Sequence, residues 1–103
     1  MPSFEICTTK YEEDIKLIQV AMTKMEAICN VASGFKFEEP TSRFGWTFLQ
    51  IYLDQELCMG IEDKFSDMIK KCKGYKPDEK FTNFLTQYFE SRGCNVKVKM
   101  VND

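Results

Sequence analysis

The sequence predicts a single α+β domain over residues 1–103, in which three helices cover a four-stranded antiparallel sheet in the order βαββααβ. Short runs with alternating apolar residues indicate strands, and longer runs with apolar spacing of three and four indicate helices. Glycine- and proline-containing segments separate these runs. Without one of the two late helices, the order is that of the split βαβ, or ferredoxin-like, arrangement. The alternative is a different α+β layout, in which the third helix folds over the second face of the sheet.

The first predicted strand is the segment SFEICT, where two apolar residues alternate with Glu5 and Cys7. A helix is expected to follow, because Thr9 and Glu12 have the spacing of a capping box. Acidic residues fill the first turn after Tyr11, where negative charge is favourable at a helix N-terminus.

This first helix is predicted to continue to about Asn30, with Gly34 as its stop signal. Its apolar stripe consists of Tyr11, Ile15, Ile18, Met22, Met25 and Cys29. The segment FKFEE then alternates and is predicted to be the second strand. The following PTSRFG is expected to be a turn-rich connection.

The third strand is predicted within RFGWTFLQIYLD, from Arg43 to Asp54, and both of its faces are apolar. Leu49, Ile51 and Leu53 form an aliphatic side that suits packing against helices. The opposite side of this strand is aromatic and consists of Phe44, Trp46, Phe48, Gln50 and Tyr52.

Asp54 is expected to cap the second helix. Gly60 interrupts that helix, so regular helix is predicted to begin only there. Pro77 suits the first position of the third helix, and Gly93 is expected to close it. The final strand is predicted in CNVKVKMV, where two lysines alternate with apolar residues.

Composition excludes several classes of protein. The chain has 14 Lys and Arg against 16 Asp and Glu, so its net charge of −2 provides no overall attraction to nucleic acid or to an anionic membrane. No apolar stretch approaches the roughly 20 residues that span a bilayer, and the N-terminal segment does not resemble a secretory signal. We therefore expect a cytoplasmic protein, in the host cytoplasm if the chain is phage- or virus-encoded, without a membrane partner.

The chain contains no histidine, which removes the commonest general base and metal ligand and excludes Ser-His and Cys-His nucleophile pairs. Five scattered cysteines lack paired ligand spacing and are expected to be free thiols. They are Cys7, Cys29, Cys58, Cys72 and Cys94. We therefore expect no catalytic residue, no metal and no cofactor. A small enzyme with a carboxylate or cysteine site is an alternative for which the sequence locates no site.

An aromatic strand face with a charged border is typical of a surface that becomes buried against something. The candidates are the third helix, another protein chain (either a different protein or a second copy), and single-stranded nucleic acid. The candidate partner-binding residues are Arg43, Phe44, Trp46, Phe48, Gln50, Tyr52, Lys97 and Lys99.

The segment GWTFLQI resembles the third-strand pattern of the RNA-recognition motif. The resemblance implies bases stacked on Trp46 and Phe48, with Arg43 near the strand start. It covers about eight residues. The first strand places Glu5 and Cys7 where that family has an aromatic residue, and a threonine replaces the family's small residue.

The prediction for function is a small non-enzymatic regulator or inhibitor that occludes a protein partner through its aromatic sheet face. Regulators, adaptors, antitoxins and phage-encoded inhibitors of host systems fit this description. A module that binds single-stranded RNA or DNA through the same face is the alternative, and the acidic net charge makes it the less favoured one.

Overall fold

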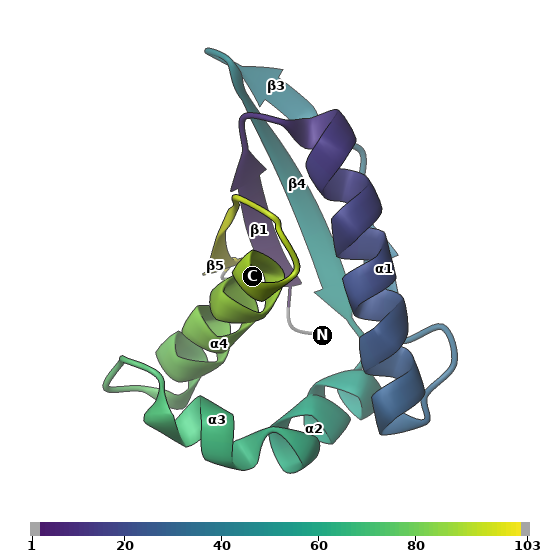
Figure 1. Ribbon diagram of the computed structural model, residues 1–103, viewed down its shortest axis with the longest axis vertical. Coiled ribbons are helices and arrows are strands. Elements are labelled where there is room, and N and C mark those ends of the chain that lie inside the picture. The colour runs from purple at the N-terminus through teal and green to yellow at the C-terminus, as the bar shows by residue number, and fades with distance from the viewer. Residues whose placement is uncertain (1–2, 102–103) are drawn as a thin grey trace.

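The computed structural model describes residues 3–101 and is an α+β fold in which four helices accompany a five-stranded antiparallel sheet (Figure 1). The elements are β1 (Ser3–Thr8), α1 (Tyr11–Cys29), β2 (Phe35–Phe37), β3 (Thr41–Arg43), β4 (Trp46–Leu53), α2 (Gln55–Lys64), α3 (Ser66–Lys71), α4 (Pro77–Ser91) and β5 (Lys97–Val101). The predicted α+β class is confirmed. The predicted number of elements is wrong, since the described part of the chain has one more strand and one more helix.

The sheet has the order β2-β4-β1-β5, and β3 pairs with β4 further along the same edge as β2. Phe37 lies opposite Ile51, whereas Thr41 lies opposite Phe48, so the register shifts by one residue between β2 and β3. Pro40 lies at this shift and cannot donate a backbone hydrogen bond to the ladder. The segment predicted as a turn-rich connection therefore contains a strand, because the chain resumes pairing with β4 after the shift in register.

The helices cover one face of the sheet. In Figure 1, α1 and α4 lie on the same side of the strands. Helices α2 and α3, which lead from β4 to α4, lie across one end of this layer. Phe81 of α4 stacks on Phe4 of β1, with ring centroids 5.6 Å apart and an interplanar angle of 23°. The alternative layout, in which the third predicted helix covers the aromatic face, is therefore wrong.

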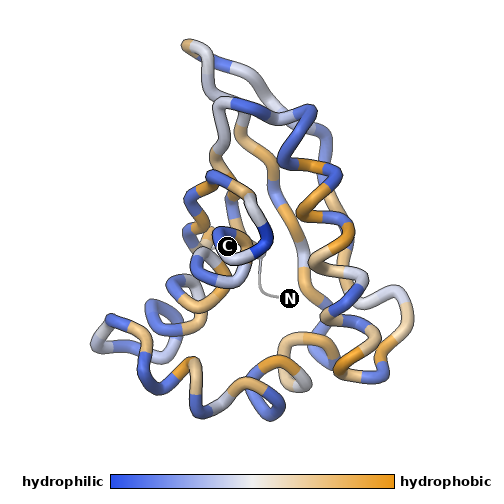
Figure 2. The backbone as a smooth tube through the Cα atoms, viewed as in Figure 1, coloured by the Kyte–Doolittle hydropathy of each residue, from blue (hydrophilic) through white to orange (hydrophobic). Residues whose placement is uncertain are grey.

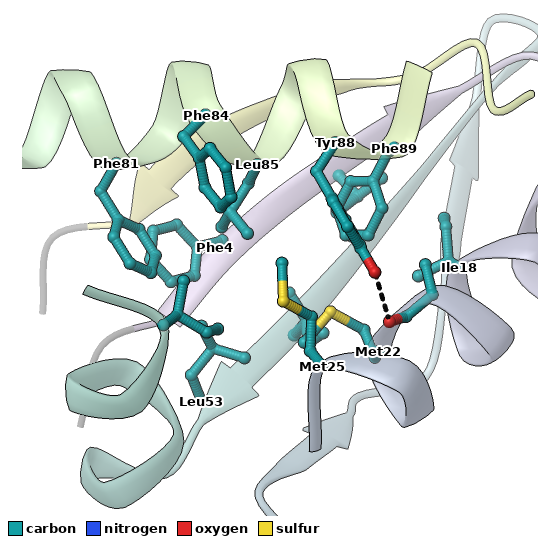
Figure 3. Packing of buried hydrophobic residues seen from close by; sticks show 14 of the residues in the cluster. Phe4, Ile18, Met22, Met25, Leu53, Phe81, Phe84, Leu85, Tyr88 and Phe89 are labelled. Atoms are coloured by element: carbon teal, nitrogen blue, oxygen red, sulfur yellow. Dashed lines mark hydrogen bonds between the residues drawn. The ribbon is translucent and has the colours of Figure 1, made fainter. Parts of the chain in front are cut away.

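The core lies between the sheet and the two long helices. Apolar residues recur along the two long helices and the strands in Figure 2, and Figure 3 shows aromatic side chains of α4 pointing toward β1 and α1. The Tyr88 hydroxyl donates a hydrogen bond to the Ala21 carbonyl at 3.3 Å, which joins α4 to α1. The guanidinium of Arg92 lies 5.0 Å from the centre of the Tyr88 ring. This contact region combines apolar packing with a defined polar link.

The first helix begins differently from the prediction. Lys10 is the N-cap residue and makes no side-chain capping bond, so the predicted capping box of Thr9 and Glu12 is absent. Instead, the Thr8 hydroxyl accepts a hydrogen bond from the Lys10 N–H at 3.0 Å and donates one to the buried Asp14 carboxylate. A threonine at the strand end therefore organises the β1–α1 corner.

Two glycines that were assigned to helix boundaries serve close packing instead. Helix α1 ends at Cys29, and its C-cap residue Asn30 adopts the left-handed conformation at φ 55°. A Cβ at Gly34 would lie 2.8 Å from Cβ of Leu57, and one at Gly60 would lie 2.9 Å from Cβ of Cys29. Both contacts bring α2 close to α1 or to the loop after it.

Helix α2 begins directly after Asp54, whose carboxylate accepts a hydrogen bond from the Gln55 N–H at 3.0 Å. This confirms the predicted cap, but the predicted late start at Gly60 is wrong. The helical segment divides at Phe65 instead, which separates α2 from α3. Pro77 opens α4 as predicted.

All five cysteines are free. Burial raises the pKa of Cys58 to about 11, and nearby carboxylates led by Glu62 add to the effect. Burial likewise raises the pKa of Cys94 to about 11, with a smaller contribution from Asp14. Both thiols are therefore protonated near neutral pH, and Cys94 packs in the apolar core.

We expect alkylation of denatured, unreduced protein to modify five thiols, measured by mass spectrometry. In the native protein at pH 8, Cys58 should react more slowly than after unfolding, because the thiolate is the nucleophile and a raised pKa depletes it. A mass deficit of two hydrogens would reveal a disulfide and contradict the first expectation. Equal native and unfolded rates at Cys58 would contradict the second.

Tyr88→Phe should lower the free energy of unfolding by about 1 kcal/mol, because it removes the hydrogen bond between α4 and α1 while keeping the ring. Tyr75→Phe is the matched control, since Tyr75 is fully exposed. Urea unfolding of the two variants measures the difference, and equal stabilities would show that the Tyr88 bond makes no net contribution.

Candidate functional site

The sheet surface opposite the helices, which we call the open face, is organised in four rows by the strand register. Listed from the β2–β3 edge to β5, the rows are Lys36, Tyr52, Ser3 and Val101; Glu38, Gln50, Glu5 and Lys99; Thr41, Phe48, Cys7 and Lys97; and Arg43 with Trp46. Residues opposite each other in neighbouring strands lie on the same side of the sheet. The aromatic residues therefore occupy β4, next to small or acidic residues on β1.

The aromatic column of β4 is accessible but held in place. Trp46 is 41% exposed, and Phe48, Gln50 and Tyr52 are partly buried. The Tyr52 hydroxyl donates to Oε1 of Gln50 at 3.1 Å. Cζ of Arg43 lies 5.6 Å from the centre of the Phe48 ring, in the range of a cation–π contact. These contacts restrict the side chains before any partner arrives, which reduces the entropy lost on binding.

Phe44 does not lie on the strand face as predicted. The strand begins at Trp46, and Phe44 and Gly45 form the two-residue turn between β3 and β4. Their φ angles of 53° and 80° are those that a type I′ hairpin turn requires. In Figure 1 this hairpin extends beyond the neighbouring strands, and Phe44 at its tip is 98% exposed.

The conformation of Phe44 is unfavourable for a bulky residue, and asparagine or glycine is preferred at such a turn position. Because the side chain is almost fully exposed, core packing does not compensate for this conformation. Residues held in sparsely populated backbone regions cluster at functional sites. The hairpin tip is therefore a candidate extension of the open face.

Charged residues border the open face at both edges, and the β2–β3 edge carries both signs because it holds Lys36 and Arg43 as well as Glu38. Glu5, Glu38 and Glu39 line a hollow of about 170 Å³, together with Thr41, Arg43, Phe48 and Gln50. At the opposite edge, Lys97 and Lys99 of β5 are exposed. A partner that covers the whole face must therefore match both signs of charge.

Cys7 lies between these two edges, opposite Phe48 on β4 and Lys97 on β5. Burial raises the pKa of its thiol, and Glu5 raises it further through its charge and a contact of 3.7 Å. Lys99 and Lys97 oppose this shift. The balance favours the protonated thiol, which is a poor nucleophile.

Seven of the eight predicted partner-binding residues lie on the open face, and Phe44 lies at the adjoining hairpin tip. The sequence prediction did not include Glu38, Glu39 and Thr41, which line the acidic hollow. The pairing of β2 and β3 with β4 brings this segment beside the aromatic strand. For Glu38, the alternation of the predicted second strand indicates that its side chain lies on the open face, but it does not indicate a hollow there.

Within residues 3–101, no group of three or more cysteine or acidic side chains is arranged to hold a metal ion. None of the helices in this range has the length and apolarity needed to cross a membrane. Comparison of the chain with protein-family models, with curated proteins and with solved structures finds no match.

Phe44→Asn should raise the free energy of unfolding by roughly 0.5–1 kcal/mol, because asparagine tolerates the left-handed conformation better. Gly45→Ala is the matched control and should lower stability by about 1 kcal/mol, since its positive φ is retained and a Cβ is added. Chemical denaturation measures both variants. A loss of stability in Phe44→Asn would mean that the phenylalanine makes a favourable native contact.

Proposed function

We propose that this chain is a small non-enzymatic protein that binds another protein through the open face and acts by occluding that partner. The observation that carries the proposal is the uncovered aromatic column of β4, where Trp46 is 41% exposed because the helices α1 and α4 lie on the opposite side of the sheet. Tryptophan, tyrosine and arginine are enriched among residues that dominate protein–protein binding energy. Such a regulator or inhibitor, in the cytoplasm of its own cell or of a phage-infected host, needs a rigid face and no catalytic group.

We also infer that the scaffold is a variant of the ferredoxin-like fold. The sheet order β2-β4-β1-β5 with antiparallel neighbours supports this assignment, because it places the two strands that follow long connections at the edges. In this description β3 extends one sheet edge, and α2 and α3 are an interrupted helix before α4.

A protein partner fits the charges of the open face better than single-stranded nucleic acid does. The stacking rings Trp46 and Phe48 and the cation Arg43 would suit bases and phosphates. However, Glu5 and Glu38 share the row next to Phe48, and Glu39 lines the same hollow. These carboxylates would repel phosphates along the path that a strand must follow.

Acrylamide should quench Trp46 fluorescence efficiently in dilute protein, because the indole is exposed at the sheet surface. Trp46→Ala should lower the free energy of unfolding by about 1 kcal/mol or less, whereas the core control Phe84→Ala should lower it by roughly 3–5 kcal/mol. The same Trp46→Ala variant should weaken capture of a protein partner by about 2 kcal/mol or more. Weak quenching together with a large stability loss in Trp46→Ala would contradict an open docking face.

Titration of labelled single-stranded oligonucleotides with the protein distinguishes nucleic-acid binding from protein binding. Labelled oligouridylate and oligothymidylate should show no anisotropy change with micromolar protein at low salt. Binding that quenches Trp46 and weakens steeply as salt rises would instead support a single-strand-binding function and overturn the protein-partner proposal.

A further inference from the structure

We propose that the open face is self-complementary and binds a second copy of this chain, so that two sheets stack face to face about a two-fold axis parallel to the strands. The inference rests on the proposed docking role of the open face and names one occupant of it. A two-fold axis in this direction keeps each row level and exchanges its two ends. The β2–β3 edge of one copy therefore lies over β5 of the other.

Charge complementarity is the first argument for this arrangement. In the second row, Glu38 stands at one end and Lys99 at the other. The two-fold operation places Lys99 of each copy over Glu38 of the other, so this charge pair occurs twice in the dimer. Lys97 of each copy lies one row further, over Thr41, beside the hollow that Glu38, Glu39 and Arg43 line. Opposite charges thus meet on both sides of the interface.

The same charges disfavour other ways of joining two copies. A two-fold axis in the plane of the interface and perpendicular to the strands would place β5 of one copy over β5 of the other. Lys97 and Lys99 would then face the lysines of the second copy. Antiparallel pairing of two β5 edges would also bring these lysines together, and lysine on an edge strand is a common device against such pairing. Face-to-face stacking with parallel strands is the arrangement that pairs opposite signs.

Shape and hydrogen bonding provide the second argument. The two-fold operation places β4 of one copy over β1 of the other. Phe48 then lies over the small, partly exposed Cys7, whereas Tyr52 lies over the position of Ser3, which its own chain already buries. In the central row Gln50 faces Glu5, and because its Oε1 already accepts the Tyr52 hydroxyl, its amide nitrogen is oriented to donate. At the Phe48–Cys7 pair a large side chain thus meets a small one, as interdigitating sheets require.

The dimer should be weak and reversible. Four strands spaced about 4.8 Å apart and four rows give a face of roughly 20 Å by 20 Å. Stacking two such faces buries roughly 800 Å² in total, in the range of weak and transient interfaces. Self-association therefore shields the aromatic column at high protein concentration and releases it on dilution. The fraction of chains whose open face is free depends on the protein concentration.

Sedimentation equilibrium tests the proposal on the intact chain. Wild-type protein should shift reversibly from the monomer mass of 12.1 kDa toward twice that mass as its concentration rises. Lys99→Glu and Glu38→Lys should each weaken self-association by at least about tenfold, because each reverses two charge pairs. An equimolar mixture of the two variants should recover wild-type affinity to within about threefold, because every pair in the mixed dimer is again of opposite sign.

Matched controls separate this pairing from a change in net charge. Lys24→Glu and Glu90→Lys alter exposed helical positions by the same charge and should leave self-association unchanged. Because Lys99 lies opposite Glu5 in its own sheet, Lys99→Glu also places two acids together. Lys97→Glu, opposite Cys7, is the second variant and should weaken self-association without adding an acid beside Glu5. Glu38→Lys should not rescue it, because the mixed dimer still places Lys99 over the substituted position 38. Thermal unfolding confirms that each variant is folded.

The outcomes distinguish this inference from the docking role on which it rests. A wild-type monomer at every soluble concentration, with Trp46 quenched by acrylamide, overturns the dimer and leaves the docking face intact. A dimer whose affinity is unchanged by Lys99→Glu and by Glu38→Lys, or failure of these two variants to rescue each other, also overturns this arrangement. A shielded Trp46 in dilute monomer would instead overturn the docking face itself.

Discussion

The packing of α4 beside α1, on one side of the sheet, is the constraint on which the rest of this structure depends. Phe81 stacks on Phe4, and Phe84, Tyr88 and Phe89 extend the same apolar surface toward α1. Once these rings are buried on the side of β1 that carries Phe4, α4 cannot also cover the opposite side. The aromatic column of β4 is therefore exposed because α4 has its apolar residues committed elsewhere, and not because the chain lacks a helix that could cover it.

Periodicity predicted the parts of the fold in which local pattern and tertiary packing agree. The alternation in β1, the stripe of α1 and the proline at the start of α4 all place apolar residues on the side where the core forms. The same alternation correctly separated the two faces of β4, since Leu49, Ile51 and Leu53 are buried while Trp46 is exposed. Most of the candidate site followed directly from this separation.

The parts that could not be predicted depend on contacts between distant segments. Thr41, Ser42 and Arg43 are polar and follow a proline, and they form a strand only because β4 is long enough to pair with both β2 and β3. Gly34 and Gly60 have the local signature of helix breakers, but they are needed where α2 approaches α1 and the loop after it. Phe44 shows the same limit, because no propensity favours phenylalanine in a left-handed turn.

The open face combines features that pull stability and recognition in opposite directions. A folding requirement alone would place asparagine at position 44 and polar residues along β4, because solvent-exposed aromatic surface invites aggregation. Charged residues at both borders, Glu38 on one edge and Lys99 on the other, limit which surfaces can approach the rings. A partner must bring a basic group to the first edge and an acidic group to the second. In the proposed dimer, the open face of a second copy, rotated about the strand direction, would bring Lys99 to Glu38 in register. With the proposed functions, self-association and occlusion of another protein would compete for the same rings, so the concentration of this chain would set how much of the open face is free.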